Sequence, residues 1–303
     1  MTDSVARSKR LGAIAIFIAA FIWSTGGVFI KEISLDAWGI SFWRSSIAAV
    51  TIYVIYLAQQ KSFGEPAPWI TPYNLLSAFF YALLLVLFVI ATKLTTSANA
   101  IFLQYTAPVY VLFLEPLLTR TKFKRSDLLT VAISTAAMAL FFIGKFETRS
   151  IWGNLAAIAS GVAFASYALS LKHERATLRS RWQVVIMGHL LIAAIMVVIS
   201  LAGATSFALA PGDLSRLLYL GVFQIGIAYA FFTYGIAHVR AIDGMLIAMV
   251  EPVLNPVWVY FGVGERPTNY AIVGGLIILL LSVIRTARGN EDTIQVEASR
   301  AGE

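Results

Sequence analysis

The sequence contains no cysteine, which excludes disulfides, thiolate metal ligands and thiol chemistry. Charged residues are also scarce, at 13% of 303 residues, about half the share of an ordinary soluble domain. A soluble protein of this size needs a charged surface, and this chain has too few charges to form one. The sequence also lacks a metal-binding cluster, a Gly-rich phosphate-binding loop and a nucleophile beside a base at a readable spacing. We therefore expect no metal, no cofactor and no catalytic residue.

Apolar and aromatic residues make up 59% of the chain, and its mean hydropathy is +0.79. A helix that crosses the ~30 Å hydrocarbon core of a bilayer needs ~20 such residues. Ten apolar segments, separated by turn and capping residues, cover roughly residues 11–31, 39–58, 71–91, 97–118, 127–143, 151–170, 182–203, 213–236, 242–262 and 269–287. The sequence thus predicts an all-α integral membrane protein with ten transmembrane helices. Its net charge of +7 does not indicate nucleic-acid binding, because apolar sequence separates the basic clusters.

Basic residues are distributed unevenly between the two sets of connecting segments. With the N-terminus in the cytoplasm, 16 of the 23 Lys and Arg residues are cytoplasmic, 6 are external, and Arg44 lies within the second helix. The positive-inside rule therefore places both termini in the cytoplasm. We expect residues 1–10 to be a cytoplasmic N-terminus and residues 288–303 to be a disordered cytoplasmic tail. The first apolar run lacks a following cleavage site, so we expect a retained helix there and not a signal peptide.

The two halves of the chain align with each other. Helices 3–4 match helices 8–9 at an offset of 144 residues, and helix 1 matches helix 6 at an offset of 141. The matched residues include Phe88 with Phe232, Pro108 with Pro252, Val109 with Val253, Gly12 with Gly153 and Lys31 with Lys172. Because each half holds five helices, an odd number, the halves must cross the membrane in opposite directions. We expect two inverted five-helix repeats, residues 11–143 and 151–287, an arrangement that recurs in secondary transporters.

Short motifs in both halves add to this pattern. They are Trp23-Ser24 in helix 1, Ala107-Pro108-Val109 in helix 4, and Glu251-Pro252-Val253 with Gly264-Glu265-Arg266 in and after helix 9. Together with the two repeats they resemble the EamA-type members of the drug/metabolite transporter superfamily, most of all the bacterial aromatic amino acid exporters. The resemblance implies alternating access and export of amino acids or other metabolites across the bacterial inner membrane. The first half has Thr121 where Glu265 would repeat, so any role of that acidic position belongs to the second half.

Glu251 lies nine residues into the predicted ninth helix, ~14 Å from its start. An ionisable group at mid-membrane is costly and usually faces a cavity or a partner. Three interpretations stay open: Glu251 binds a substrate ammonium, it titrates with coupled protons, or it makes a structural hydrogen bond beside Pro252. Pro108, Pro252 and Pro256 remove backbone hydrogen bonds, and we interpret them as hinges or kinks that line a cavity.

Deep aromatic and amide residues predict the lining of that cavity. Aromatic rings with polar tips suit amphipathic organic solutes, and amides can hydrogen-bond a zwitterion. With Glu251, the candidate substrate-binding residues are Trp23, Tyr81, Gln104, Tyr105, Tyr167, Gln224, Tyr229, Asn255 and Trp258, although each alone is compatible with simple packing. For Arg44 we expect a position near the outer surface with its cation reaching the interface, the alternatives being a substrate carboxylate or Glu265 as partner. His189 is expected to be a packing residue.

These residues favour a secondary transporter that exports amino acids, including aromatic ones, and similar amphipathic metabolites around a central cavity. Two alternatives remain: a membrane-embedded enzyme, with Glu251 and His189 as its one candidate pair, and a proton-coupled drug or metabolite antiporter. A channel would need a ring of like polar groups, which the sequence does not show. The expected partners are a small-molecule substrate and the lipid bilayer, without nucleic acid, and a single chain is expected to function as a monomer.

Overall fold

A computed structural model describes residues 2–63, 66–119, 125–141, 143, 150–173, 175–203, 205–263 and 268–284. All regular structure in these ranges is helical, and they contain no strand. The elements are α1 (Thr2–Trp23), α2 (Gly26–Glu32), α3 (Ala37–Gln59), η1 (Gln60–Ser62), α4 (Pro72–Leu94), α5 (Ser97–Gln104), α6 (Ala107–Thr119), α7 (Arg125–Phe141), α8 (Ile151–Lys172), α9 (Leu178–Leu201), α10 (Asp213–Leu218), η2 (Tyr219–Ile227), α11 (Ala228–His238), α12 (Ala241–Ala248), α13 (Val250–Val263) and a last helix, Asn269–Ile284. The predicted tail and Glu265 lie outside the described residues.

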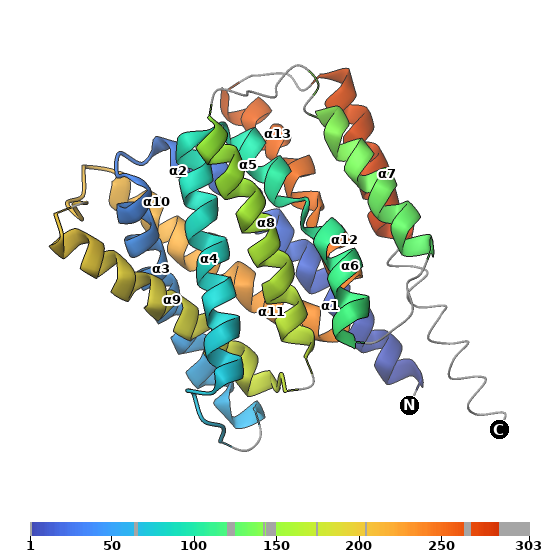
Figure 1. The fold of residues 1–303 in the computed structure, drawn as a ribbon, viewed down its shortest axis with the longest axis horizontal. Helices are drawn as coiled ribbons and strands as arrows, with labels where there is room; N and C mark the ends of the chain where they lie inside the picture. The colour runs from blue at the N-terminus through green and yellow to red at the C-terminus, as the bar shows by residue number, and fades with distance from the viewer. Residues whose placement is uncertain are drawn as a thin grey trace.

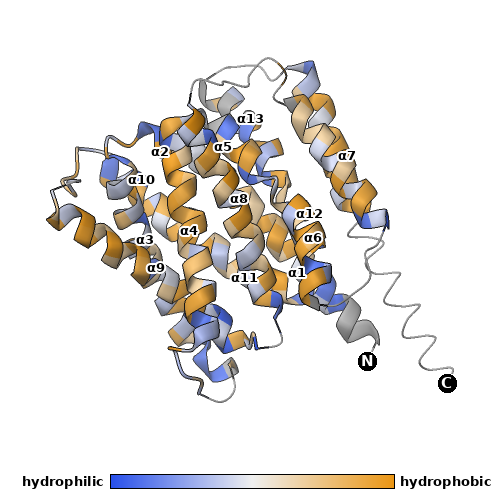
Figure 2. Cartoon of the chain, in the orientation of Figure 1, coloured by the Kyte–Doolittle hydropathy of each residue, from blue (hydrophilic) through white to orange (hydrophobic). Residues whose placement is uncertain are grey.

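Seven helical stretches in the described residues are long and apolar enough to cross a membrane. They are Arg7–Glu32, Ala37–Gln59, Pro72–Leu94, Asn99–Leu118, Ile151–Lys172, Leu178–Leu201 and Asp213–His238. Figure 2 shows apolar residues along the helices and hydrophilic ones mainly at the helix ends and connections. The prediction of an all-helical fold is thus confirmed for the described residues, and seven of their helices are suited to crossing a membrane. The other three predicted spans coincide with the shorter α7, the α12–α13 pair and the last helix, so the total of ten spans stays a prediction.

Three of the predicted spans are interrupted near their middle. The first breaks at Ser24–Thr25, between α1 and α2, and another breaks at Tyr105–Thr106, between α5 and α6. A third break, at Met249, separates α12 from α13. Pro108 and Pro252 follow the last two breaks within one helical turn. Backbone N–H groups in the first turn of a helix have no intrahelical partner, so a proline there costs no hydrogen bond. Both prolines therefore begin a new helix, whereas α13 continues through Pro256.

The helices of the two halves pack on each other reciprocally. In Figure 1, α4 and α8 run side by side through the middle of the bundle, and these two helices make an extensive contact. The third helix of the first half (α4) thus packs on the first helix of the second (α8), while α1 packs on α11 in the same way. The second helices of the two halves, α3 and α9, pack on each other. This exchange of equivalent contacts is what two structural repeats packed on each other reciprocally produce.

Glycine allows the α1–α11 contact to be close. A Cβ atom on Gly235 would lie 2.6 Å from the backbone oxygen of Gly12, and one on Gly12 would lie 3.0 Å from the oxygen of Gly235. The equivalent glycine of the second half, Gly153, packs against the end of α4, where a Cβ would lie 2.9 Å from Cβ of Thr95. Small residues let membrane helices approach closely, so these glycines fix the spacing between the halves.

Replacing Gly235 by alanine should therefore destabilise the bundle. Its methyl group would meet backbone that cannot rotate away, so α1 and α11 must move apart, at a cost of about 1–3 kcal/mol. Thermal unfolding of the purified protein in detergent measures this change. Gly39→Ala is the comparison variant and should lose less stability, since its methyl group would lie 3.2 Å from the nearest atom, the backbone oxygen of Ser206. Equal unfolding temperatures for Gly235→Ala and the wild type would contradict the close packing of α1 on α11.

Candidate functional site

A buried cavity of about 30 Å³ lies between the two halves. Its lining residues come from α1, α3, α4, α5, α8, η2, α11 and α13, and so from both halves of the chain. They are Trp23, Arg44, Leu84, Leu85, Phe88, Gln104, Phe164, Gln224, Ile225, Tyr229 and Glu251. None of them is more than 7% exposed. Five predicted site residues therefore line one cavity, together with Arg44, so one acidic and one basic side chain lie in its wall.

Glu251 owes its position to the helix break before it. The break at Met249 makes Val250 the start of α13, so Glu251 lies in the first turn of a helix that begins inside the bundle. A helix N-terminus has free N–H groups and a positive dipole end, which favour a carboxylate there. The side chain is 6% exposed, and its Oε2 accepts a hydrogen bond from Tyr105 Oη at 2.6 Å. Tyr105 thus holds the carboxylate from behind the cavity.

The predicted aromatic residues other than Trp258 assemble into one cluster around the cavity. The rings of Trp23 and Tyr229 lie 4.7 Å apart, and Tyr81 packs on Tyr229 at 4.8 Å. Tyr167 joins behind them, 4.8 Å from Tyr81. Tyr81 also contacts His189, with Tyr81 Oη and His189 Nε2 separated by 2.9 Å. Trp23 and Tyr229 line the cavity, while Tyr81 and Tyr167 pack on Tyr229 from outside the lining. Tyr105 does not line the cavity either, and its ring contacts that of Phe164.

The two predicted glutamines approach the cavity from opposite halves. Gln104 Nε2 donates to Ser160 Oγ at 2.7 Å, which orients its amide. Gln224 lies on η2, a π-helical stretch, and a Cβ on Gly26 would lie only 2.4 Å from its Nε2. Gly26 therefore makes room for this side chain at the break between α1 and α2. Oε1 of Gln224 and Nε1 of Trp23 have no hydrogen-bond partner, so both are available to a ligand.

Asn255 and Trp258 do not line this cavity. Asn255 Nδ2 donates to the backbone oxygen of Ser24 at 3.1 Å, and Trp258 Nε1 donates to Ser24 Oγ at 2.6 Å. Both side chains thus fasten α13 to the break after Trp23, the residue that faces the cavity. Their role in the structure is to hold two interrupted helices together.

Arg44 is the residue whose position the sequence reasoning placed wrongly. It lies neither near the surface nor in reach of the interface, because its side chain is 1% exposed and lines the cavity. The reason is tertiary: η2 packs on α3 so closely that a Cβ on Gly221 would lie 3.1 Å from the backbone oxygen of Arg44. The sequence does contain a signal for this position, because an arginine within an apolar membrane helix usually faces the interior of the bundle or a cavity.

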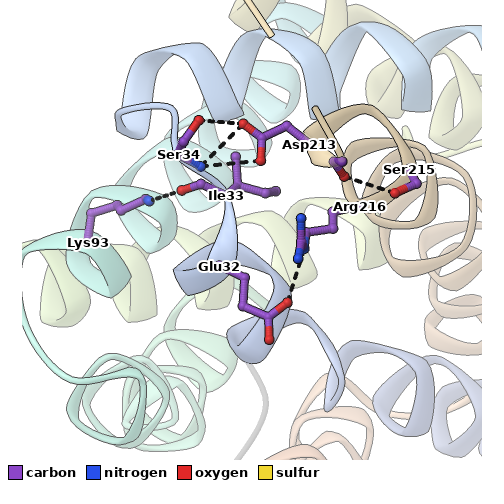
Figure 3. A network of polar contacts seen from close by, with 8 residues as sticks. Glu32, Ile33, Ser34, Lys93, Asp213, Ser215 and Arg216 are labelled. Atoms are coloured by element: carbon purple, nitrogen blue, oxygen red, sulfur yellow. Dashed lines mark hydrogen bonds and ion pairs between the residues drawn. The ribbon is translucent and has the colours of Figure 1, made fainter. Parts of the chain in front are cut away.

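Polar contacts join the two halves at both ends of the bundle. At one end, Ser34 donates to Asp213 through its backbone N–H and its hydroxyl, and Arg216 Nε donates to Glu32 at 3.0 Å (Figure 3). Lys93 Nζ also donates to the oxygen of Ile33 in the same network. At the other end, Arg240 forms an ion pair with Asp127 of the first half. The cavity therefore lies between two inter-repeat contacts.

Changing Trp258 to phenylalanine should loosen the junction between α13 and the α1–α2 break. The ring is kept, but the hydrogen bond to Ser24 is lost, which should cost about 1 kcal/mol of unfolding free energy. Thermal unfolding in detergent checks the loss. Trp152→Phe, at a residue that is 73% exposed, is the matched control and should unfold as the wild type does. Identical shifts in both variants would show that the Trp258–Ser24 bond contributes nothing.

Comparison with known proteins places this architecture in a family. The model of the EamA-like transporter family matches residues 10–143 and again residues 151–285. An "Uncharacterized transporter" of Archaeoglobus fulgidus is 25% identical over 282 residues, covering 90% of this chain and 95% of its own length. The "Uncharacterized transporter YwfM" of Bacillus subtilis is 24% identical over 290 residues, covering 93% of this chain and 96% of its own.

A solved structure described as "Crystal structure of protein" shares the fold. Its TM-score is 0.72 at 18% sequence identity, with 92% of this chain and 98% of that chain covered. The family model matches each half of the chain separately, and the helices are apolar enough to span a membrane several times. The chain belongs to the EamA-like transporter family and is a multi-pass membrane protein.

Proposed function

We propose that the protein is a secondary transporter that exports amino acids, including aromatic ones, and similar small amphipathic metabolites by alternating access. The observation that carries this proposal is the cavity between the halves. It combines aromatic walls with two amides and two opposite charges, a lining that suits a zwitterion with an apolar side chain. In this proposal Glu251 binds the substrate ammonium, and Trp23 and Tyr229 contact the side chain.

The size of the cavity supports a mechanism in which the halves move. About 30 Å³ holds one or two water molecules and is far too small for an amino acid. Substrate can therefore enter only if the two halves separate. The contacts of Asp213 and Arg216 at one end, and of Arg240 at the other, would break in turn. The breaks before Pro108 and Pro252 are the proposed hinges, since they recur at one repeat position.

The finer features of the protein belong to the same proposal. Ten helices cross the bacterial inner membrane, both termini are cytoplasmic, and a single chain works as a monomer because it contains both halves of the cavity. Transport needs no titrating group in this proposal, so a substrate gradient suffices. The enzyme alternative loses its candidate pair, since His189 contacts Tyr81 and is not among the residues that line the cavity with Glu251. The antiporter alternative depends on Glu251 as the coupling group.

Transport by the purified protein in liposomes tests the proposal. We expect saturable uptake of labelled phenylalanine and tryptophan into substrate-loaded vesicles, with or without a pH gradient. Glu251→Gln should weaken the apparent affinity roughly tenfold, because a charged hydrogen-bond partner is lost. Glu251→Asp, which keeps the carboxylate, should retain part of the apparent affinity. Uptake only with a pH gradient, abolished in Glu251→Gln, would instead favour the antiporter; no uptake of phenylalanine, tryptophan, threonine or methionine would exclude amino acid transport.

The distribution of basic residues predicts which ends of the helices face the outside. Because the chain has no cysteine, one introduced cysteine is a unique label. Ser206 and Lys61 are both exposed and lie in connections of opposite predicted sides. A membrane-impermeant maleimide should label Ser206→Cys in intact cells, and Lys61→Cys only after permeabilisation. The reverse pattern would overturn the orientation derived from the basic residues.

A further inference from the structure

Arg44 faces the cavity with unused hydrogen-bond donors. Its Nε and Nη1 have no partner, and its Nη2 makes a long contact of 3.4 Å with the backbone oxygen of Leu85. A guanidinium carries five N–H donors and stays protonated, so a buried one is normally paired with an anion or with several acceptors. With a side chain that is 1% exposed, Arg44 has almost no access to solvent either. Its donors are therefore available to something that enters the cavity.

The carboxylate in the same cavity does not serve as its partner. Arg44 and Glu251 both line the space, but they do not form an ion pair within 4.0 Å. Glu251 is instead bonded to Tyr105. The groups near Arg44 on neighbouring helices include Leu85 and Tyr81 of α4 and Tyr229 of α11, and these three bring no negative charge. The cavity thus holds a basic and an acidic side chain that are not paired with each other, and each contacts a neutral group.

Two further atoms near the cavity, one donor and one acceptor, also have no hydrogen-bond partner. Trp23 Nε1 is an unpartnered donor, and Gln224 Oε1 is an unpartnered acceptor. A ligand with one anionic acceptor group and one cationic donor group would satisfy all of them. Arginine matches a planar carboxylate through two parallel hydrogen bonds. A phosphate is disfavoured, since it carries more negative charge and the cavity offers a single cation beside a carboxylate.

We infer that Arg44 binds the carboxylate of the transported molecule, so that the protein takes only substrates with a free carboxylate. This inference rests on the proposed transport function and narrows it. Arg44 and Glu251 come from α3 of the first half and α13 of the second, so a zwitterion bound to both would bridge the two repeats. Amines without a carboxylate, and amino acid amides or esters, are then excluded.

Competition in the liposome assay tests this requirement. Unlabelled phenylalanine should inhibit uptake of labelled phenylalanine, whereas phenylalaninamide and 2-phenylethylamine should not. Arg44→Met should weaken the apparent affinity for phenylalanine roughly tenfold to a hundredfold, the effect of losing hydrogen bonds between charged groups. Arg44→Lys should recover little, because a lysine lacks the planar fork. Inhibition by 2-phenylethylamine equal to that by phenylalanine would overturn the inference while leaving the transport function intact.

Thermal unfolding separates a binding role from a structural one. Arg44→Met removes a buried charge without a counter-ion, so the ligand-free variant should unfold at the wild-type temperature or above it. The control is Arg181→Met, because Arg181 Nε donates to the oxygen of Leu171 at 2.9 Å away from the cavity. It should lower the unfolding temperature and leave the competition pattern unchanged. A marked loss of stability in Arg44→Met, with an unchanged competition pattern, would make Arg44 structural.

The same measurement keeps the inference testable if no amino acid is transported. Phenylalanine and 3-phenylpropionate, which share the carboxylate, are each added to the wild type and to Arg44→Met in detergent. Both compounds should raise the unfolding temperature of the wild type, and neither should affect the variant. Stabilisation by 3-phenylpropionate alone would contradict amino acid transport and keep Arg44 as the carboxylate site. No stabilisation by either compound would exclude the carboxylate site itself.

Discussion

A charge within the hydrocarbon layer has to be enclosed by protein, and the arrangement of this bundle follows from that constraint. Each charged side chain exposed there would cost several kcal/mol. Arg44 and Glu251 avoid this cost because helices of both halves surround them, leaving exposed fractions of 1% and 6%. The apolar side chains can face lipid, so the polar interior defines where the halves must meet. The cavity lies at that meeting point.

Helix interruption is what supplies polar groups at this depth. An unbroken helix satisfies its own backbone and offers only side chains to a ligand. Here the breaks at Ser24–Thr25, Tyr105–Thr106 and Met249 bring helix ends into the interior of the bundle. Glu251 lies at one such helix start. Ser24, at the first break, accepts hydrogen bonds from two side chains of α13, which connect that helix to the break. The interruptions therefore place Glu251 and connect α13 to the first break, whereas Arg44 comes from the uninterrupted α3.

The candidate site is asymmetric although the helices around it are arranged nearly symmetrically. The contacts α4–α8 and α1–α11 exchange under the repeat, and the prolines after two breaks recur. The charges do not recur: Ala107 occupies the position equivalent to Glu251 at the offset of 144 residues. The two repeats pack on each other reciprocally, while their unequal lining residues give the cavity an arginine from one half and a glutamate from the other.

The sequence by itself determined the helical membrane class, most helix positions and the two halves, because apolar length and periodic spacing are local properties. It also indicated Glu251, Gln104, Gln224, Trp23 and Tyr229, since polar and aromatic groups deep in apolar segments need an enclosed place. Only the tertiary structure decided that Arg44 joins them and that Asn255 and Trp258 brace Ser24. The direction of a side chain around its helix depends on how the helices pack, and no single segment encodes that.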